Sequence, residues 1–258
     1  MKKLLLIALT GLLAVGATAP ALALGPLDIE AELPYYTKYV WRGMNLVDDA
    51  VLQPSIEVGL FGFELGVWGN LDLTDINGDS GKFSEVDYFL GYELELPLVE
   101  LGTGFIFYTF PEIDGAGTTE FYLSAEAGVL LSPSLAVYFD IDEVKGTYWE
   151  ASVNHDFALG ETATLNLAAG LGMGSESYIN GYFGEMLLVP NPDLGASPAD
   201  YHVRASLPFH PVPLFTIAPS VTYTSLLGDA ETALDNDELL YYGKSENVVW
   251  GIAAGFEF

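Results

Sequence analysis

Apolar and polar residues alternate with a period of two along most of this chain, which is the spacing of a β-strand with two different faces. The final stretch, residues 248–258, shows the pattern most clearly. One face carries the large apolar residues Val248, Trp250, Ile252, Ala254, Phe256 and Phe258. The other face carries the small or polar residues Val249, Gly251, Ala253, Gly255 and Glu257. A transmembrane β-barrel turns such a large face towards lipid, whereas a soluble sheet buries it against a second layer.

Segments of about ten alternating residues, bounded by turn residues, recur about twelve times. The predicted strands cover residues 29–42, 53–61, 63–73, 84–95, 99–110, 119–130, 134–142, 147–158, 162–173, 201–210, 214–226 and 246–258. Short connections at 61–62, 97–98, 132–134, 160–161 and 211–213 alternate with long ones at 43–52, 74–83, 111–118, 174–200 and 227–245. Only the segment 143–146 is short where a long connection is due. The alternation predicts an all-β fold, a transmembrane antiparallel β-barrel of about 12 strands with both termini in the periplasm.

Acidic residues avoid the apolar face of these strands. In segment 84–95, Tyr88 and Leu90 fall on one face, while Glu85 and Asp87 fall on the other. A charge facing lipid costs about 2–4 kcal/mol at mid-membrane in the worst cases, and less for acids. The segregation therefore has a physical cause in a membrane barrel, and a soluble periplasmic β-protein is the weaker alternative.

The first residues form a predicted secretory signal peptide. Lys2 and Lys3 precede the apolar run 4–17, and the small residues Ala21 and Ala23 mark a cleavage site after residue 23. A membrane-anchoring helix fits less well, because Thr10, Gly11 and Gly16 interrupt the run. The predicted organisation is a signal peptide over 1–23 and an outer-membrane β-barrel over 24–258. The terminal Phe258 resembles the C-terminal signature of bacterial outer-membrane barrels, which implies the barrel assembly machinery and outer-membrane lipid as partners.

The formal net charge of −28 becomes −30 once two lysines leave with the signal peptide. Such a chain does not bind nucleic acid, and it favours cations, divalent ions or a saline habitat. Strand alternation places Lys38, Arg42 and Arg204 inside the barrel. The acidic residues predicted to line the pore with them are Glu57, Glu64, Glu85, Asp87, Glu120, Glu126, Asp140, Glu150 and Asp156. Opposed charges would screen solutes in a cation-preferring lumen, unless Lys38 and Arg42 only neutralise neighbouring carboxylates.

Two long connections carry further candidate chemistry. Asp75, Asn77 and Asp79 have the spacing of the first three ligands of a calcium loop. Ser80 and Val86 then replace the expected Gly and Glu, so a plain acidic loop is the alternative to a Ca²⁺ site, and no other cofactor is predicted. Within 174–200, the stretch 178–189 is too apolar for a free loop; it folds into the pore as a constriction or packs over the barrel mouth.

An enzyme acting on lipids would need a serine, a histidine and an acid brought together. His155 points to lipid while Ser152 points inward, and His202 and Ser206 are too far apart along one strand. His210 lies at a turn. No triad is assembled by neighbouring positions, so the chain is predicted not to be an enzyme, although a partner from another strand would change that.

Three short motifs carry a resemblance to a known family. They are Tyr39-Val40-Trp41-Arg42-Gly43, Val51-Leu52-Gln53-Pro54-Ser55 and Ser84-Glu85-Val86-Asp87-Tyr88-Phe89-Leu90-Gly91-Tyr92, with a looser echo at 107–111. Over residues 35–95 the chain resembles the TorF porin family, which implies an outer-membrane channel. The predicted function is passive diffusion of small solutes. The alternatives are a lipid-modifying barrel enzyme and a structural or adhesive barrel with a plugged lumen.

Overall fold

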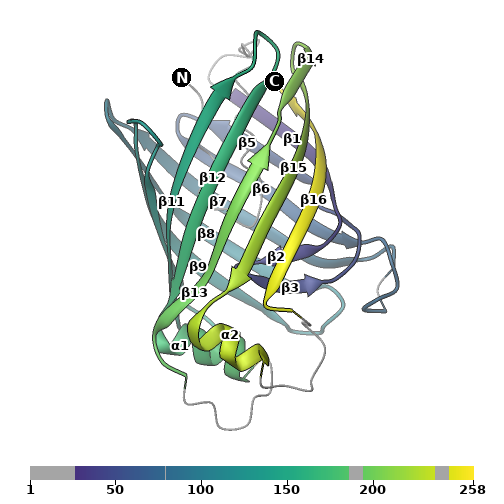
Figure 1. Ribbon diagram of the computed structural model, residues 1–258, viewed down its shortest axis with the longest axis vertical. Helices are drawn as coiled ribbons and strands as arrows, with labels where there is room; N and C mark the ends of the chain where they lie inside the picture. The colour runs from purple at the N-terminus through teal and green to yellow at the C-terminus, as the bar shows by residue number, and fades with distance from the viewer. Residues whose placement is uncertain (1–26, 79, 186–193, 236–243) are drawn as a thin grey trace.

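The computed structural model describes residues 27–78, 80–185, 194–235 and 244–258, so the predicted signal peptide lies outside the described residues. The chain forms a closed antiparallel β-barrel of 12 strands (Figure 1), which confirms the predicted fold. The barrel strands are β1 (Leu27–Tyr36), β4 (Val51–Leu52) with β5 (Ser55–Leu60), β6 (Phe63–Asp72), β7 (Phe83–Glu95), β8 (Val99–Thr109), β9 (Gly117–Ala127), β10 (Ser134–Asp140), β11 (Thr147–Ala158), β12 (Thr164–Gly174), β13 (Ser197–Ser206), β15 (Phe215–Leu226) and β16 (Glu246–Glu257).

Pairing between the two ends of the chain closes the barrel. β1 pairs antiparallel with β16, with Glu30 opposite Glu257 and Tyr36 opposite Gly251. β13 pairs directly with β15, and the short strand β14 (Phe209–Val212) pairs with the part of β15 that lies beyond the β13 pairing. β4 and β5 follow one another along β1 and act as a single barrel strand interrupted at residues 53–54. Closure leaves no open sheet edge, which a barrel in lipid requires.

Short and long connections lie at opposite ends of the barrel. Figure 1 shows the short turns at the end that holds the C-terminus, and the long connections at the other end. At the turn end, Phe61 and Gly62 join β5 to β6 with φ values of 52° and 83°, as a type I′ hairpin turn requires. We call these ends the turn end and the loop end. The predicted alternation is confirmed, and so is the short connection between β10 and β11.

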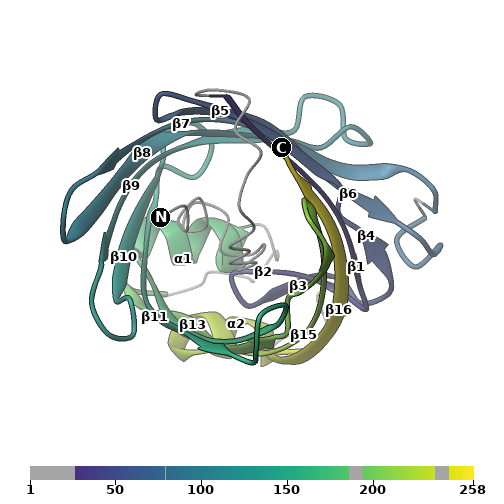
Figure 2. The ribbon, with the colours of Figure 1, turned by 90° about the horizontal axis from the view of Figure 1, so that it is seen from above.

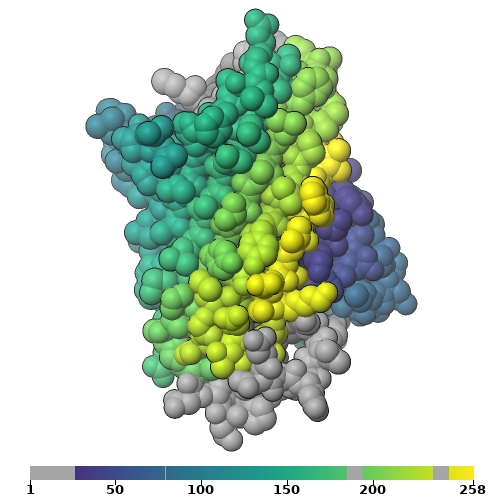
Figure 3. All heavy atoms as spheres, viewed as in Figure 1, coloured from purple at the N-terminus to yellow at the C-terminus, as the bar shows by residue number. Residues whose placement is uncertain are grey.

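The outer face of the barrel is apolar. Leu65, Leu90, Val153, Trp250 and Ile252 are each between 40% and 61% exposed. Side chains at alternate positions point inward and are buried or half-buried, as the period-two pattern predicts. Figure 3 shows one side of this wall, formed by parallel bands of β11 to β16. None of the described helices has the length and apolar character needed to span a membrane.

Neighbouring positions on β11 test this orientation. Val153 points outward and is 40% exposed, whereas Ser152 is half-buried on the inner face. We expect Val153→Lys to lower the free energy of unfolding in lipid vesicles by about 2–4 kcal/mol, because the ammonium group is forced into hydrocarbon. The matched variant Ser152→Lys keeps its charge inside the barrel and is expected to cost much less. Urea unfolding in vesicles measures both, and equal costs would contradict the lipid-facing assignment.

The predicted first strand, 29–42, is wrong beyond Tyr36. The chain leaves the wall there and forms a hairpin of β2 (Tyr39–Trp41) and β3 (Met44–Val47), which pair only with each other. Arg42 and Gly43 form its two-residue turn, with φ values of 46° and 81°. Both positive angles are those of a type I′ turn, which reverses the chain within two residues. Figure 2 shows the β2–β3 hairpin inside the ring of barrel strands.

Candidate functional site: a hairpin across the barrel interior

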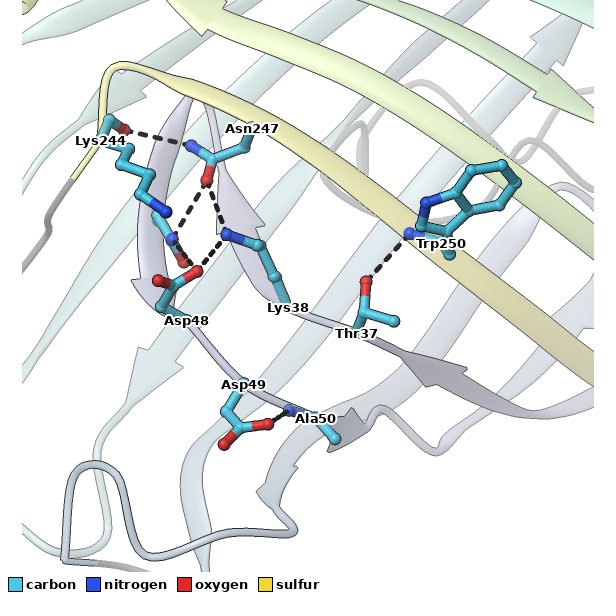
Figure 4. Close-up of polar contacts among 9 residues, drawn as sticks. Thr37, Lys38, Asp48, Asp49, Ala50, Lys244, Asn247 and Trp250 are labelled. Carbon is cyan, nitrogen blue, oxygen red and sulfur yellow. Dashed lines mark hydrogen bonds and ion pairs between the residues drawn. The ribbon is translucent and has the colours of Figure 1, made fainter.

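The base of the β2–β3 hairpin is fixed to β16 by polar side chains (Figure 4). Lys38 forms an ion pair with Asp48 and also donates a hydrogen bond of 3.3 Å to Asn247. Asn45 donates to the same Asn247 oxygen over 3.1 Å. The backbone nitrogen of Trp250 donates to Thr37 Oγ1 over 3.0 Å. Lys38 was predicted to line the pore, and in the structure its ammonium group serves as an anchor of the hairpin.

The tip of the hairpin reaches the far wall. Arg42 Nη1 and Nη2 each lie 2.7 Å from one carboxylate oxygen of Glu120 on β9, which makes a bidentate ion pair. Tyr108 donates a hydrogen bond of 2.9 Å to the same carboxylate. The side chains of Arg42 and Glu120 are only 6% and 1% exposed. A buried, bidentate pair of this kind is far stronger than an exposed one, because water competes for neither partner.

Aromatic rings surround the guanidinium group of Arg42. Its Cζ atom lies 4.5 Å from the ring centre of Trp41, 4.4 Å from Tyr138, 4.3 Å from Tyr148 and 5.8 Å from Tyr178. All four distances are within the range of a cation–π contact. We call Glu120, Tyr108, Tyr138, Tyr148 and Tyr178 the Arg42 cage. Four of its members were not among the predicted site residues.

Further side-chain contacts join the hairpin to the barrel strands on either side of it. Tyr39 donates a hydrogen bond of 2.9 Å to Glu85 on β7 and packs against Trp68, with ring centres 5.5 Å apart. A Cβ atom at Gly43 would lie 2.6 Å from Leu226 and 2.7 Å from the Cβ atom of Asp200. The hairpin therefore touches β7 and β9 on one side and β13 and β15 on another, so it spans the interior at the loop end.

The segment after β12 covers the same end. The one-turn helix α1 (Glu176–Ile179) continues into the π-helix η1 (Asn180–Glu185), and Ser175 caps its start by accepting a hydrogen bond from the Tyr178 backbone. Ile179 and Phe183 are fully buried. Tyr182 packs against Trp41 at 5.1 Å, so α1 and η1 support the hairpin from outside. The described part of the predicted apolar segment therefore packs at the barrel mouth, against the hairpin (Figure 1). Residues 186–193 lie outside the described residues. The helix α2 (Gly228–Asp235) lies beside α1 and contacts η1 (Figure 1).

Asp140 was predicted to line the pore, but its carboxylate holds a loop in place. One oxygen accepts hydrogen bonds from the backbone nitrogens of Asp142, Val144 and Lys145 over 3.1–3.2 Å. The other accepts from Thr118 and Tyr182. With both oxygens engaged, Asp140 organises the β10–β11 connection and η1.

The inward carboxylates of the turn end include several that are half-buried. Glu57, Glu93 and Asp156 are half-buried, whereas Glu85, Asp87, Glu120 and Glu150 towards the loop end are at most 7% exposed. Glu64 and Glu126 point inward on the turn side and are each 7% exposed. The side chain of Glu93 is within hydrogen-bonding reach of Glu64 and Glu100. Carboxylates this close share protons or hold a cation between them. We call Glu57, Glu64, Glu93, Glu100 and Glu126 the acidic wall.

Arg204 lies on β13, which is separated from the strands of the acidic wall on both sides of the ring. The side chain of Arg204 lies close to the hydroxyl of Tyr36 on β1. Its positive charge interacts with the carboxylate of Glu32 on the same strand. Arg204 therefore lies on the inner face of the barrel. The acidic wall and the guanidinium group of Arg204 therefore lie on different sides of the interior.

Comparisons with known proteins place the chain in a family. The model of a family described as "Bacterial protein of unknown function (Gcw_chp)" matches residues 20–181. The chain belongs to the Gcw_chp family. The matched residues include the β2–β3 hairpin and all five residues of the Arg42 cage. The family description does not carry the TorF name. No curated protein sequence matches the chain.

Solved structures show what the Gcw_chp barrel is similar to in fold. A structure described as "KdgM porin in complex with disordered oligogalacturonate" matches with a TM-score of 0.51 and 11% identity, over 90% of this chain and 99% of that one. The NanC porin matches at 0.47 and 11%, over 89% and 98%. The outer membrane phospholipase A of Escherichia coli matches at 0.44 and 11%, over 88% and 92%. At such low identity the similarity concerns the fold alone.

The predicted calcium ligands of the Gcw_chp chain are not assembled in the described residues. Asp75 is exposed, and the amide of Asn77 donates a hydrogen bond of 3.2 Å to the backbone oxygen of Leu46 in the hairpin. Asp79 lies outside the described residues. Where the structure describes the chain, it shows no group of three residues able to hold a metal ion.

The histidines are distributed over different parts of the barrel. His155 packs edge-on against Phe157 at 4.6 Å on the outer face, and His202 lies inside, over Gly170. His210 shares a hydrogen bond of 2.9 Å with Thr216 at the turn end. These positions bring no two of the three histidines to one place in the part of the chain that the structure describes.

Proposed function

We propose that this chain is a porin-like outer-membrane channel for small solutes, in which the β2–β3 hairpin forms the constriction and the acidic wall favours cations. The observation that carries the proposal is a closed barrel with half-buried acids at its turn end and a hairpin across its loop end. In the bacterial outer membrane, the turn end faces the periplasm. The proposal includes a signal peptide removed after residue 23 and insertion by the barrel assembly machinery, as the C-terminal strand indicates.

The preferred solute differs in charge from the oligogalacturonate of the KdgM complex. Oligogalacturonate is a polyanion, and the net charge of −28 together with the acidic wall would repel it. A narrow path lined by carboxylates instead concentrates cations. The negative charge of the interior therefore supports the proposal that the solutes are small cations and small neutral molecules. The likeness to the TorF family supports the same class of channel.

A plugged structural barrel is the second candidate, and the packing of the hairpin favours it. Arg42, Glu120, Trp68 and Gln53 are nearly or fully buried at the loop end, which leaves little room beside the hairpin. The two candidates differ in a single property, because a plugged barrel does not conduct ions.

Planar-bilayer recording under a salt gradient tests the proposal. We expect discrete steps in the current, and a reversal potential with the sign that cation selectivity gives. In the variant Glu64→Gln/Glu93→Gln/Glu100→Gln, the reversal potential is expected to move towards zero, because neutral amides replace three carboxyl groups and the acidic wall loses negative charge. The control Glu112→Gln changes an exposed loop residue paired with Lys82. This variant is expected to have the same reversal potential as the wild type. A folded barrel that shows no steps would support the plugged structure instead.

A further inference from the structure

The Arg42 cage is built almost entirely by residues outside the hairpin that fills it. Glu120 and Tyr108 come from β9 and β8, Tyr138 and Tyr148 from β10 and β11, and Tyr178 from α1. Trp41, which also faces the guanidinium group, lies on the hairpin and is not a member of the cage. The barrel wall and α1 therefore present a complete receptor for the guanidinium group, and Arg42 is delivered to it on a separate element.

The chemistry of the cage is selective for a planar cation. The carboxylate of Glu120 accepts two parallel hydrogen bonds of 2.7 Å, a geometry that the planar fork of a guanidinium group satisfies. Tyr108 donates to one of these oxygens and fixes the orientation of the carboxylate. Tyr138 and Tyr148 lie within 4.4 Å of the cation centre. Since Glu120 is 1% exposed, water cannot replace the cation that neutralises it.

We propose that the Arg42 cage is a binding site for small organic cations that carry a guanidinium group, and that Arg42 occupies it as an internal ligand. A free guanidinium compound competes with Arg42 for Glu120 and releases the tip of the hairpin. The binding site itself is independent of conduction. Only the consequence, a wider channel when the tip is released, rests on the proposed function.

Tethering makes Arg42 a strong competitor in the wild-type chain. A group held on a short segment has an effective concentration in the millimolar range, so a free cation binds weakly until Arg42 is removed. Arg42→Asn removes the guanidinium group and keeps the turn, because Asn-Gly is a favoured type I′ pair and residue 42 has a φ of 46°. Alanine would strain the same turn and is the poorer choice.

Methylguanidinium chloride is the probe, titrated into the detergent-folded full chain with sodium chloride replacing it at equal ionic strength. Calorimetry and the thermal unfolding temperature are measured for wild type, Arg42→Asn and Arg42→Asn/Glu120→Gln. We expect saturable binding to Arg42→Asn, with affinity about tenfold or more above both other proteins, because the double variant lacks the charged acceptor and the wild type holds Arg42 there. Binding to Arg42→Asn no tighter than to the double variant would overturn the proposal.

A second measurement applies where Arg42→Asn folds poorly by itself. Refolding from urea with millimolar methylguanidinium is expected to restore the folded yield of Arg42→Asn and to leave the double variant unchanged. No rescue, or equal rescue of both, overturns the proposal. Neither measurement depends on conduction, so a protein that binds methylguanidinium but is silent in a bilayer contradicts the channel alone.

Discussion

Glu120→Gln is expected to lower the free energy of unfolding by about 3–5 kcal/mol, because it leaves the guanidinium group of Arg42 buried without a counter-charge. The pair is bidentate, with both contacts at 2.7 Å, and water reaches almost none of either side chain. The substitution keeps the size of the side chain, so little packing is lost. Urea unfolding of the barrel in lipid vesicles measures the effect.

Two variants separate the buried pair from ordinary surface effects. Glu112→Gln removes the exposed ion pair with Lys82 and is expected to cost less than about 1 kcal/mol. Arg42→Asn/Glu120→Gln removes both charges of the buried pair, so it is expected to be more stable than the sum of the two single effects implies. A cost for Glu120→Gln no larger than that for Glu112→Gln would show that the pair does not hold the hairpin in the interior.

Removing the hairpin is expected to raise the size limit for solutes and to increase conductance severalfold. Tyr36 and Val51 are paired across β1 and β4, so an Asn-Gly turn in place of residues 37–50 can join them directly. The pairings of β1 with β5 and β16 do not depend on the replaced residues and remain intact. Combining the deletion with Glu120→Gln avoids leaving a buried carboxylate without its cation. Swelling of proteoliposomes in sugars of increasing size measures the size limit.

An equivalent deletion elsewhere provides the control. Thr109 and Gly117 are paired between β8 and β9, so residues 110–116 can also be replaced by Asn-Gly. This connection contains neither the hairpin nor α1. Its loss is therefore expected to leave the size limit for solutes unchanged. If both deletions changed swelling equally, or neither did, the hairpin would not be the constriction.

The barrel strands could be predicted from the sequence because each one carries its own period-two signal. Strands such as β11 (Thr147–Ala158) and β6 (Phe63–Asp72) agree with prediction to within a residue or two. The inward direction of Glu85, Glu120 and Glu150 was also predicted, since one face of each strand is apolar. Local alternation suffices for these features, and it requires no knowledge of distant contacts.

The β2–β3 hairpin could not be predicted in the same way. Alternation continues past Tyr36, so the pattern extends the first strand into the hairpin. The dipeptide Arg42-Gly43 was the available signal, because a residue followed by Gly between two short apolar runs favours a type I′ turn. The Arg42 cage depends on Tyr138, Tyr148 and Tyr178, which follow Arg42 in sequence by 96, 106 and 136 residues and are brought to it only by barrel closure. Nothing local to these tyrosines indicates their partner.

The unitary conductance of the wild-type chain and of the chain with residues 37–50 replaced, recorded in the same bilayer and salt gradient, tests most directly whether the hairpin constricts a channel. We expect small cation-selective steps for the wild type and larger steps, still cation-selective, for the variant. Steps of equal size would contradict a constriction at the hairpin. No steps from either protein, when both are folded in the membrane, would contradict a channel.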